Sequence, residues 1–435
     1  MACRHAAAVA AGCDPRFTVD ASRVTFGPGA LTEVGPRMAA HGARRVALVT
    51  DARLRQLPWF AEVAASLAAA GVDAAVFDQV AIEPTEVAVA DAIRFVRAAG
   101  VDGLVSLGGG SAIDTAKLAN LGTVIDPDIT RFVAVPQGDG RAVDRPLLPH
   151  LACPTTSGTG SEVTGIAIFD WQARHVKTGV ASPRLRPAEA VIDPRVTSTL
   201  PSAVVAASGL DVLCHAVESY TARPHTRRPA PATPLARPMS QGANRWSDLG
   251  CREALTLLGR YLVRAVTDAA DAEAREQVMW AATLAGIAFG NAGVHVPHAM
   301  AYAIAGGVRD FVAAGYPSGV PLVPHGFAVA ISAPAVVARL GPSDDARHLD
   351  AARCLGGELA GVGPGEGGAA LADVVGGLMA AIGAPRSLAT VGYAAADVAP
   401  LVTATLPQRR LLDNAPIDVD REVLTELFHA ALEVR

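Results

Sequence analysis

The first half of the chain alternates short β-branched runs with Ala-rich stretches, and this rhythm strongly limits the folds available to it. Candidate strands span residues 45–51, 73–78 and 102–107, and candidate helices over 57–71 and 86–100 separate them. A strand–helix–strand–helix–strand order joins parallel strands through helices that cover the sheet. The N-terminal half is therefore predicted to be an α/β domain on a parallel, doubly wound sheet.

After about residue 200 the pattern changes to long apolar-periodic segments with few strands between them. The spacing of their apolar residues predicts helices over 203–220, 248–267, 272–290 and 326–340. Two prolines within 193–202 mark the change. We therefore expect an α/β domain over residues 1–200 and an all-α domain over 201–435.

Composition and charge exclude several classes of protein. The 435 residues are 51% hydrophobic and 18% charged, and the net charge is −5. This balance suits a large buried core and does not fit a basic nucleic-acid-binding face or a polybasic membrane patch. We expect no apolar run to approach the ~20 residues that a membrane-spanning helix needs, because the longest Ala, Val and Leu stretches carry Arg, Asp or Gly. We therefore expect small-molecule partners rather than nucleic acid or a membrane.

The cysteines and the start of the chain bear on location. The six cysteines are scattered and form no CxxC pair, which is typical of reduced thiols in a reducing compartment. The opening MACRHAAAVAAGCDPRF has no acid before Asp14 and faintly resembles a transit peptide, but it is short and carries no serine. The cytoplasm is the expected location, with the mitochondrion as the alternative for a eukaryotic chain.

A glycine-rich turn follows the third candidate strand. GLVSLGGGSAIDTAKLANLG places Gly108, Gly109, Gly110 and Ser111 between a strand and a helix. Ser111 is in position to cap this helix, with Asp114 at the capping-box position. Free N–H groups and the positive end of the helix dipole would suit a pyrophosphate. The spacing matches neither GxGxxG nor GxxxxGK[ST], so a tight βα turn without a ligand remains an alternative.

A second loop, CPTTSGTGSEVT (153–164), offers many neutral donors to ribose and phosphate oxygens. Its hydroxyl side chains, around two glycines, are Thr155, Thr156, Ser157, Thr159 and Ser161. Asp51 ends the first candidate strand, where its carboxylate can accept bonds from adenosine ribose and would repel a 2′-phosphate. The pattern favours NAD over NADP, although an ordinary strand-end aspartate would look the same.

Polar residues in the helical half have the composition of a metal site. In GLDVLCHAVESY, Asp211 and His215 stand at i and i+4 on one helix face, where a salt bridge would look the same locally. His298 and His325 follow in apolar surroundings. One carboxylate and three imidazoles suit a divalent first-row metal acting as a Lewis acid, with Fe(II) and Zn(II) both compatible. His295, three residues before His298, is a rival ligand or a group near the substrate.

Several ordered motifs carry a family resemblance. GGGSAIDTAK, PTTSGTGSEVT, GLDVLCHAVESY, PHAMAYAIAG and PHGFAVAISAPAVV together resemble the iron-containing (group III) alcohol dehydrogenase family, from about Phe26 to the C-terminus. This resemblance implies a dehydroquinate synthase-like fold, with a dinucleotide-binding α/β domain before a helical one. It implies metal ligands at Asp211, His215, His298 and His325. It also implies NAD contacts at Asp51, Gly108, Gly109, Gly110, Ser111, Asp114, Thr155, Thr156, Thr159 and Lys177.

Within that family the chain most resembles the hydroxyacid–oxoacid transhydrogenase subgroup. ESYTAR, RPMSQGANRWSD and GYAAADVAPLVTATLPQRRLL carry this likeness. Many family members have a second histidine four residues after the third ligand, whereas this chain has Tyr302 there, as the subgroup does. Tyr302 is therefore predicted to be catalytic, with His295 as a further candidate. The family also implies a homo-oligomer, a dimer or larger.

The subgroup implies hydride transfer through NAD from a hydroxy acid such as 4-hydroxybutyrate to an oxo acid such as 2-oxoglutarate. Dicarboxylates need cationic partners, and the arginine candidates are Arg227, Arg228, Arg237 and Arg245. The first three belong to the Pro/Arg-rich stretch 222–238, which cannot be helix or central strand and is either a surface loop or a loop over the active site.

Three other functions remain open at this point. The first is a conventional NAD-dependent alcohol or hydroxy-acid dehydrogenase that releases NADH in each turnover. The second is a non-catalytic sensor of nucleotides or sugar phosphates on the same fold. The third is metal-dependent cyclase chemistry on a related scaffold, against which the Asp/His/His/His set argues.

Overall fold

The computed structural model describes residues 9–135, 137–174, 176–316 and 319–433. The chain divides into two compact units, Asp20–Thr199 and Leu200–Arg435 together with Met1–Val19. The change from one unit to the other falls one residue before the predicted boundary. The opening residues 1–8, where the transit-peptide resemblance begins, lie outside the described residues.

The N-terminal segment departs from the predicted domain 1–200, because residues 9–19 belong to the helical unit. Arg237 donates to the Asp14 carboxylate through Nε (3.0 Å) and Nη2 (2.9 Å), and to the Thr18 hydroxyl at 2.8 Å. Gln241 exchanges two hydrogen bonds with the Thr18 backbone, at 2.7 and 2.8 Å. The prediction was wrong for this segment because its partners lie more than 200 residues away in the sequence.

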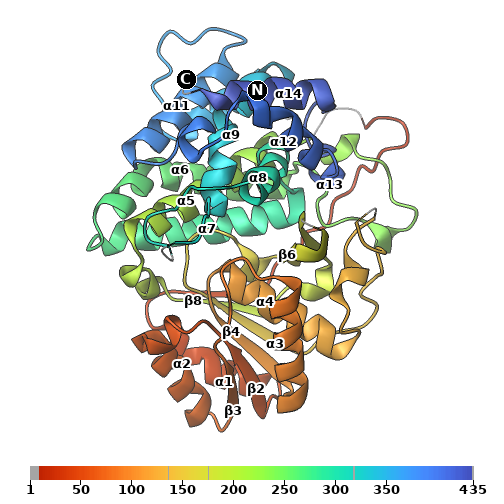
Figure 1. The fold of residues 1–435 in the computed structure, drawn as a ribbon, viewed down its shortest axis with the longest axis vertical. Coiled ribbons are helices and arrows are strands. Elements are labelled where there is room, and N and C mark those ends of the chain that lie inside the picture. Colours follow the sequence, from red (N-terminus) through yellow and green to blue (C-terminus); the bar gives the residue numbers. More distant parts are fainter. Residues whose placement is uncertain (1–8, 136, 175, 317–318, 434–435) are drawn as a thin grey trace. The chain divides into compact units, whose positions relative to one another are not determined.

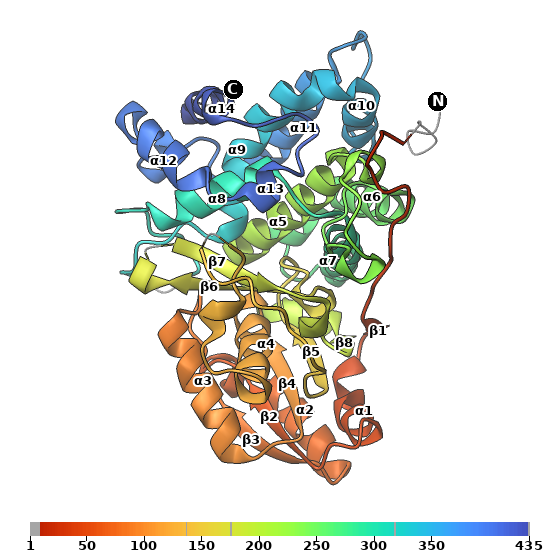
Figure 2. The ribbon, with the colours of Figure 1, turned by 90° about the vertical axis from the view of Figure 1, so that its right-hand side faces the viewer.

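The Asp20–Thr199 unit is built on a six-stranded parallel sheet in the order β1-β8-β5-β4-β2-β3. Its strands are β1 (Arg23–Phe26), β2 (Arg45–Val49), β3 (Asp73–Phe77), β4 (Gly103–Gly108), β5 (His150–Pro154) and β8 (Glu189–Ile192). Its helices are α1 (Val34–Ala40), α2 (Pro58–Ala69), α3 (Glu86–Ala99) and α4 (Gly110–Val124). Figures 1 and 2 show α3 and α4 together on one face of the sheet, and α1 and α2 on the other. The predicted parallel, doubly wound sheet is confirmed.

Local sequence signals explain where α3 begins and ends. The Thr85 hydroxyl accepts from the Ala88 N–H, and Gly100 ends the helix in the left-handed conformation. Its buried residues Val89, Ile93 and Val96 recur at helical spacing and pack toward the sheet. Every residue of β4 is buried, as expected for a strand covered on both faces.

A separate antiparallel hairpin accompanies the sheet. It consists of β6 (Ile166–Trp171) and β7 (Val176–Ala181), and Asp170 lies opposite Lys177. The hairpin packs against α4, beside which it lies in Figure 2. The alternation of strands and helices in the first half of the sequence did not indicate it.

The other unit is helical over residues 200–433, where the structure describes them. Its main helices are α5 (Ser202–Thr221), α6 (Arg245–Thr267), α7 (Ala272–Ala292), α8 (Val296–Gly306), α9 (His325–Leu340), α10 (Asp345–Cys354), α11 (Gly367–Ala381), α12 (Val398–Thr405), α13 (Arg409–Leu412) and α14 (Arg421–Leu432). The four predicted helices correspond to α5, α6, α7 and α9. The Pro/Arg-rich stretch contains only the short 3-10 turns His225–Arg227 and Pro234–Ala236, so neither helix nor central strand forms there, as predicted.

One helix corrects the expectation about membrane-spanning runs. Among the described residues, His325–Ser343 is long and apolar enough by length and composition, with a mean hydropathy of 1.3. In the 18-residue apolar window of this helix 72% is buried, and the helix packs against α5, α8 and α11. Packing among other helices accounts for its apolar composition.

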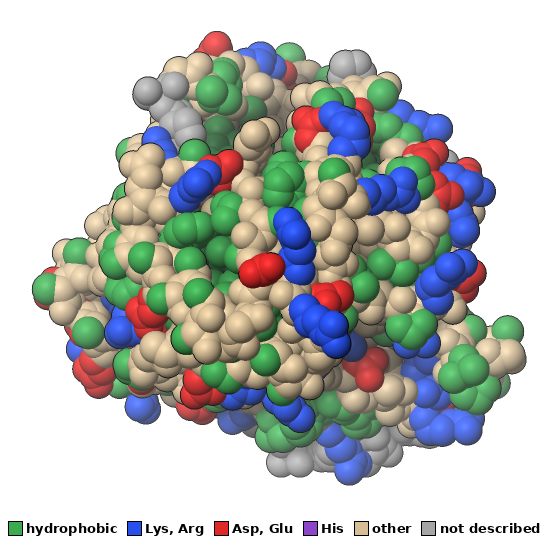
Figure 3. All heavy atoms as spheres, turned by 90° about the horizontal axis from the view of Figure 1, so that it is seen from below, with side chains coloured by type: hydrophobic (Ala, Val, Ile, Leu, Met, Phe, Trp, Pro, Cys, Tyr) green, Lys and Arg blue, Asp and Glu red, His purple; other side chains and the backbone are tan. Residues whose placement is uncertain are grey.

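Charged side chains are interspersed on the face drawn in Figure 3. Lys and Arg side chains there lie among Asp and Glu side chains and apolar groups. Elsewhere on the chain, Arg55 forms an ion pair with Asp78. Pairs at an exposed surface contribute little to stability, so this pattern bears on solubility rather than on the fold.

Candidate metal centre and nucleotide region

The helical unit gathers all four predicted metal ligands around one carboxylate oxygen. Asp211 Oδ1 lies 3.6 Å from His215 Nε2, 3.5 Å from His298 Nε2 and 3.8 Å from His325 Nε2. One ligand atom from each of Asp211, His298 and His325 lies within 4.8 Å of the other two. Residues separated by more than 100 positions in the sequence thus form a single cluster.

The spacing of these atoms fits a metal better than ion pairs alone. Donors bound to one first-row cation at about 2.0–2.2 Å stand roughly 3–4 Å apart, and each imidazole Nε2 lies at such a distance from Asp211 Oδ1. Asp211 Oδ1 and His298 Nε2 are buried and have no hydrogen-bond partner among the described residues. The rings of His215 and His298 stack with centroids 4.7 Å apart, where two protonated imidazoles would repel each other. A divalent cation would satisfy both buried atoms and keep the imidazoles neutral.

Close helix packing brings the ligands together. Asp211 and His215 lie one turn apart on α5, and His325 is the first residue of α9. At Gly326 an added Cβ would lie 1.8 Å from the Ala207 carbonyl oxygen and 3.1 Å from the Asp211 Cβ. A glycine after His325 therefore lets the start of α9 approach α5 closely enough for His325 to reach Asp211.

Glu218, which the sequence analysis did not single out, orients one of the predicted ligands. It lies on α5 one turn after His215, and its Oε1 accepts a 2.6 Å hydrogen bond from His298 Nδ1. Its Oε2 accepts from the His295 N–H at 2.6 Å and the His298 N–H at 3.4 Å. A carboxylate on the far nitrogen fixes the tautomer of a ligating imidazole and turns Nε2 toward the metal. Its position seven residues after Asp211, on an apolar helix, was the available signal.

The electrostatics of the cluster keep its carboxylates ionised. Burial opposes ionisation of Asp211, but the surrounding imidazoles hold the pKa of that carboxyl well below its usual range. Burial likewise opposes a charge on His298, but Glu218 and Asp211 outweigh it and raise the His298 pKa to about 9. The site is thus strongly attractive to a cation, whether a proton or a metal ion.

His295 serves the backbone rather than the metal cluster. Its Nδ1 accepts from the Val296 N–H at 2.8 Å, and its Nε2 lies 3.1 Å from the Thr221 hydroxyl. Since both ring nitrogens are used, the structure argues against His295 as a rival ligand. Burial lowers its pKa to about 4, so the ring is neutral at pH 7.

Tyr302 lies beside the cluster. Its half-buried ring packs against His325, with centroids 6.3 Å apart and an angle of 22° between the planes. The structure thus places a phenol next to one of the predicted ligands, where the sequence analysis predicted a catalytic group.

In the other unit, the glycine-rich turn and the hydroxyl loop pack directly against each other. The Thr155 N–H donates to the Gly108 carbonyl at 3.0 Å. A Cβ at Gly110 would lie 2.6 Å from the Thr159 methyl group, and one at Gly109 would lie 3.3 Å from the Thr156 side chain. Glycine is therefore required here so that the threonine loop can pack closely. The sequence had suggested only that these glycines let a ligand approach the backbone.

The capping prediction at Ser111 and Asp114 was wrong. The helix begins at Gly110 after Gly109, which has no side chain to cap it, and the Ser111 hydroxyl accepts from the Glu83 N–H at 3.2 Å. The buried Asp114 carboxylate instead accepts from Ser161 and, at 2.9 Å, from the Ile168 N–H. It therefore holds α4 to the hydroxyl loop and to β6. The uncapped N–H groups at the start of α4 remain suited to a phosphate.

Asp51 and Lys177 have partners within the protein. Asp51 Oδ1 accepts from the Arg53 and Leu54 N–H groups, both at 2.9 Å, and Oδ2 makes no hydrogen bond with a described residue. That second oxygen is available to a ribose. Lys177 Nζ forms an ion pair with Glu83 Oε1 at 2.6 Å.

Two of the arginines considered for the dicarboxylate have internal partners. Arg237 holds Asp14 and Thr18, and Arg228 donates to the Asn414 side chain at 2.8 Å. Arg227 and Arg245 are exposed. The geometry therefore gives Arg237 and Arg228 structural roles, tying distant segments of the helical unit together.

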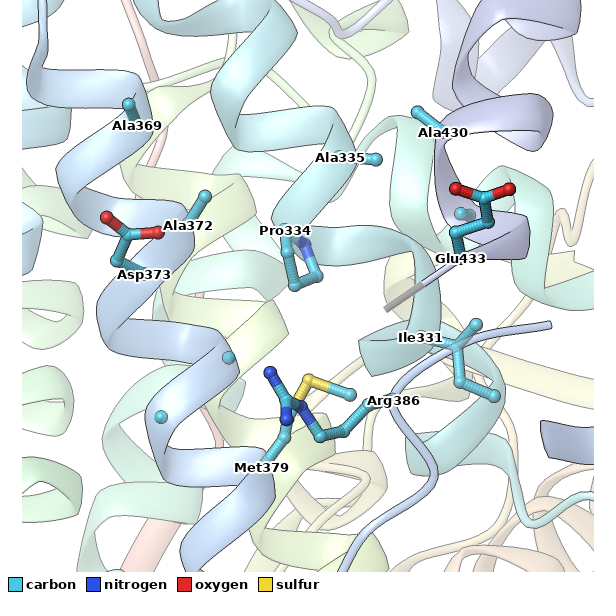
Figure 4. A pocket seen from close by; sticks show the side chains of 13 residues that line it. Ile331, Pro334, Ala335, Ala369, Ala372, Asp373, Met379, Arg386, Ala430 and Glu433 are labelled. Atoms are coloured by element: carbon cyan, nitrogen blue, oxygen red, sulfur yellow. The ribbon is translucent and has the colours of Figure 1, made fainter. Parts of the chain in front are cut away.

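A pocket of about 270 Å³ opens among α9, α11 and α14 and includes none of the predicted site residues (Figure 4). Pro334 of α9 faces it together with Met379 and Arg386. Because proline lacks an N–H, it breaks one helical hydrogen bond at this point of α9. The residues that line this pocket are therefore different from the predicted metal ligands.

Comparisons with known proteins agree with this geometry. The model of iron-containing alcohol dehydrogenase matches residues 21–194, and that of the C-terminal part of the Fe-containing alcohol dehydrogenase family matches 238–432. Mitochondrial hydroxyacid-oxoacid transhydrogenase of Bos taurus is 42% identical over 97% of this chain and 91% of its own length. The Xenopus laevis protein of the same name is 42% identical over 99% and 93%.

A solved structure shows the same fold. The crystal structure of 1,3-propanediol oxidoreductase has a TM-score of 0.84 and 27% identity, and the match covers 96% of this chain and 100% of that one. The family models together cover most of the chain, and the transhydrogenase relatives match almost all of it. This chain is an oxidoreductase and belongs to the iron-containing alcohol dehydrogenase family.

Proposed function

We propose that this protein is a hydroxyacid–oxoacid transhydrogenase that keeps its nicotinamide nucleotide between two half-reactions. In the first, 4-hydroxybutyrate and NAD⁺ give succinic semialdehyde, NADH and a proton. In the second, 2-oxoglutarate, NADH and a proton give 2-hydroxyglutarate and NAD⁺. The two steps balance, so no nucleotide is consumed.

The observation that carries the proposal is the Asp211-centred cluster in a chain so similar to transhydrogenases over nearly its full length. Asp211, His215, His298 and His325 would hold the metal, with Fe(II) favoured by the family and Zn(II) also compatible with the donors. When bound, such a cation supplies Lewis-acid polarisation of the substrate carbon–oxygen bond. Glu218 keeps His298 turned toward the cluster through the 2.6 Å hydrogen bond to Nδ1.

The nucleotide would be held by Asp51, the Gly108–Ser111 turn, Thr155, Thr156, Thr159 and Lys177, with Asp114 bracing the loop. Support comes from the uncapped start of α4 and from Asp51 Oδ2, which has no protein partner among the described residues. NAD supplies the hydride acceptor of one half-reaction and the hydride donor of the other. The Asp51 carboxylate favours NAD over NADP.

Proton movement is assigned to Tyr302. Its ring packs on His325, and its hydroxyl would take the proton of the hydroxy acid in one half-reaction and return a proton to the oxo acid in the other. His295 is bonded at both ring nitrogens and would support the fold of the site instead.

A two-substrate assay tests the proposal. Purified protein with 4-hydroxybutyrate and 2-oxoglutarate, but without added nucleotide, is expected to form 2-hydroxyglutarate. Product that forms only with excess NAD⁺ or NADH would support the conventional dehydrogenase instead. His298→Ala should lose both metal and turnover; retained ligand binding and output in this variant would support a sensor.

The proposed setting is a homo-oligomer, a dimer or larger. Its proposed compartment is the cytoplasm, or the mitochondrion if the chain is eukaryotic, since the relatives named above are mitochondrial enzymes. Both points can be measured, by light scattering of the purified protein and by fractionation of the source cells.

A further inference from the structure

A strained residue stands at the tip of the loop between β3 and α3. Glu83 has φ of 55° and is the only residue other than glycine with a positive φ among the residues that the structure describes. A side chain in this left-handed conformation costs free energy, and such residues persist where surrounding contacts hold them. Ile82, its neighbour, is 50% exposed, so the tip is not held by burial of that side chain.

Two contacts of Glu83 hold the tip in place. Its N–H donates to the Ser111 hydroxyl at 3.2 Å, in the first turn of α4. Its carboxylate pairs with Lys177 Nζ at 2.6 Å, and the Lys177 side chain is 10% exposed. The loop is therefore joined on one side to the glycine-rich turn and on the other to the hairpin.

The two ends of the loop are anchored independently of Glu83. At its start, Asp51 bridges Gln79, and the Val80 N–H donates to the Thr50 carbonyl at 3.3 Å. At its end, the Asp170 N–H donates to the Pro84 carbonyl at 2.8 Å. Residues 81–83 therefore form a tip between two anchored ends.

The hairpin completes a ring of contacts. Lys177 lies opposite Asp170 on the paired strands, and Ile168 of β6 donates to Asp114 of α4 at 2.9 Å. The ring thus runs from Ser111 through Glu83 and Lys177 into the hairpin and back to α4. The Glu83–Lys177 pair joins the loop tip to the hairpin through side chains.

We infer that the Glu83–Lys177 ion pair is a clasp that keeps this loop closed at the nucleotide region and slows NADH release between the half-reactions. The inference rests on the proposed function, in which Ser111 and Lys177 belong to the nucleotide site. The strain at Glu83 favours opening once the pair breaks, so the carboxylate contributes to closure together with the Ser111 bond. Glu83 is a positioning residue and takes no part in hydride transfer.

The test is the rate at which bound NADH leaves. Protein loaded with NADH is mixed with excess NAD⁺, and the loss of bound-NADH fluorescence is followed for the parent, Glu83→Gln and Asp78→Asn. Asp78 is a matched control, since it is a carboxylate of the same loop that pairs with Arg55 instead. We expect Glu83→Gln to release NADH about tenfold faster, which corresponds to ~1.4 kcal/mol, and Asp78→Asn to release it at the parent rate.

A release rate of Glu83→Gln equal to the parent rate, or slower because Lys177 becomes free to hold a phosphate, would overturn the clasp. Glu83→Asp keeps the charge but shortens its reach, so it should also release NADH faster and serves if the glutamine variant does not fold. The two-substrate assay on the parent protein separates the failures. If the parent protein binds NADH but forms no 2-hydroxyglutarate without added nucleotide, the transhydrogenase proposal fails, and the NADH release rates still test the clasp. If the parent protein binds no NADH, both proposals fail.

Discussion

Replacing Glu218 by glutamine is expected to weaken metal binding without removing any ligand. The side chain keeps its size, but a neutral amide replaces the carboxylate that accepts from His298 Nδ1 at 2.6 Å and from the His295 N–H at 2.6 Å. Burial opposes the charge on Glu218, and His298 is the main reason that its pKa nevertheless lies below the usual range. The native site therefore depends on a buried, ionised acceptor.

The size of the effect follows from these bonds. A hydrogen bond to a charged group contributes roughly 1.5–3 kcal/mol, and about 1.4 kcal/mol changes an equilibrium constant tenfold. Loss of the charge on one oxygen should therefore lower metal affinity by roughly 10- to 100-fold, the range typical of changes to the partners of metal ligands. The unfolding temperature of the metal-loaded protein should fall as well.

Metal affinity can be measured by competition with a chelator of known affinity, with the metal in each fraction counted by mass spectrometry. Glu426→Gln is the matched control, because Glu426 is a half-exposed carboxylate of the same unit that pairs with Arg339. The control should bind metal like the parent. An unchanged metal affinity in Glu218→Gln would refute the assignment of Glu218 as the group that orients His298.

Three further changes test other parts of the structure. Gly326→Ala should lose metal, because its Cβ would lie 1.8 Å from the Ala207 carbonyl oxygen; metal bound in full amount would contradict the close approach of α9 to α5. Arg237→Gln should lower the free energy of unfolding by about 1–3 kcal/mol, because the bonds to Asp14 are lost. The KM for oxo acids should stay unchanged, and a raised KM would indicate that Arg237 binds the substrate. Burial lowers the His150 pKa from 6.5 to about 3, so below pH 6.5 the unfolded chain binds a proton that the folded chain does not. This difference should lower the stability of the parent by about 2 kcal/mol at pH 5, and His150→Gln should remove that part of the pH dependence. Parallel urea-melt curves for parent and variant between pH 7 and 5 would exclude that contribution.

Periodicity predicted the fold class because its signals are local. The runs at 45–107 became β2, α2, β3, α3 and β4 with ends within about two residues of those expected, since apolar spacing and caps fix such elements from neighbouring residues. The hairpin β6–β7 and the attachment of residues 9–19 to the helical unit depend on distant partners. No local pattern carries that information.

The candidate site was predictable only in part, because local motifs indicate which residue types are present but not their distant partners. The chemistry of Asp211 and three histidines indicated a metal, and the structure brings them together. The sequence did not indicate the role of Glu218, because an acidic residue on a helix usually faces solvent unless it binds a buried partner, as Glu218 binds His298. The use of His295 as a cap depends on the backbone turn before α8, where φ is −140° and ψ is −122°. Sequence spacing does not determine such a turn.

The central claim is that Asp211, His215, His298 and His325 bind one divalent cation. X-ray absorption at the metal edge of the purified, fully loaded protein tests it most directly. We predict a first shell of nitrogen and oxygen at about 2.0–2.2 Å, with scattering from three imidazole rings, and no bound metal in His298→Ala purified and loaded in the same way. A first shell that contains sulfur, or a His298→Ala variant that retains the metal in full amount, would contradict the account.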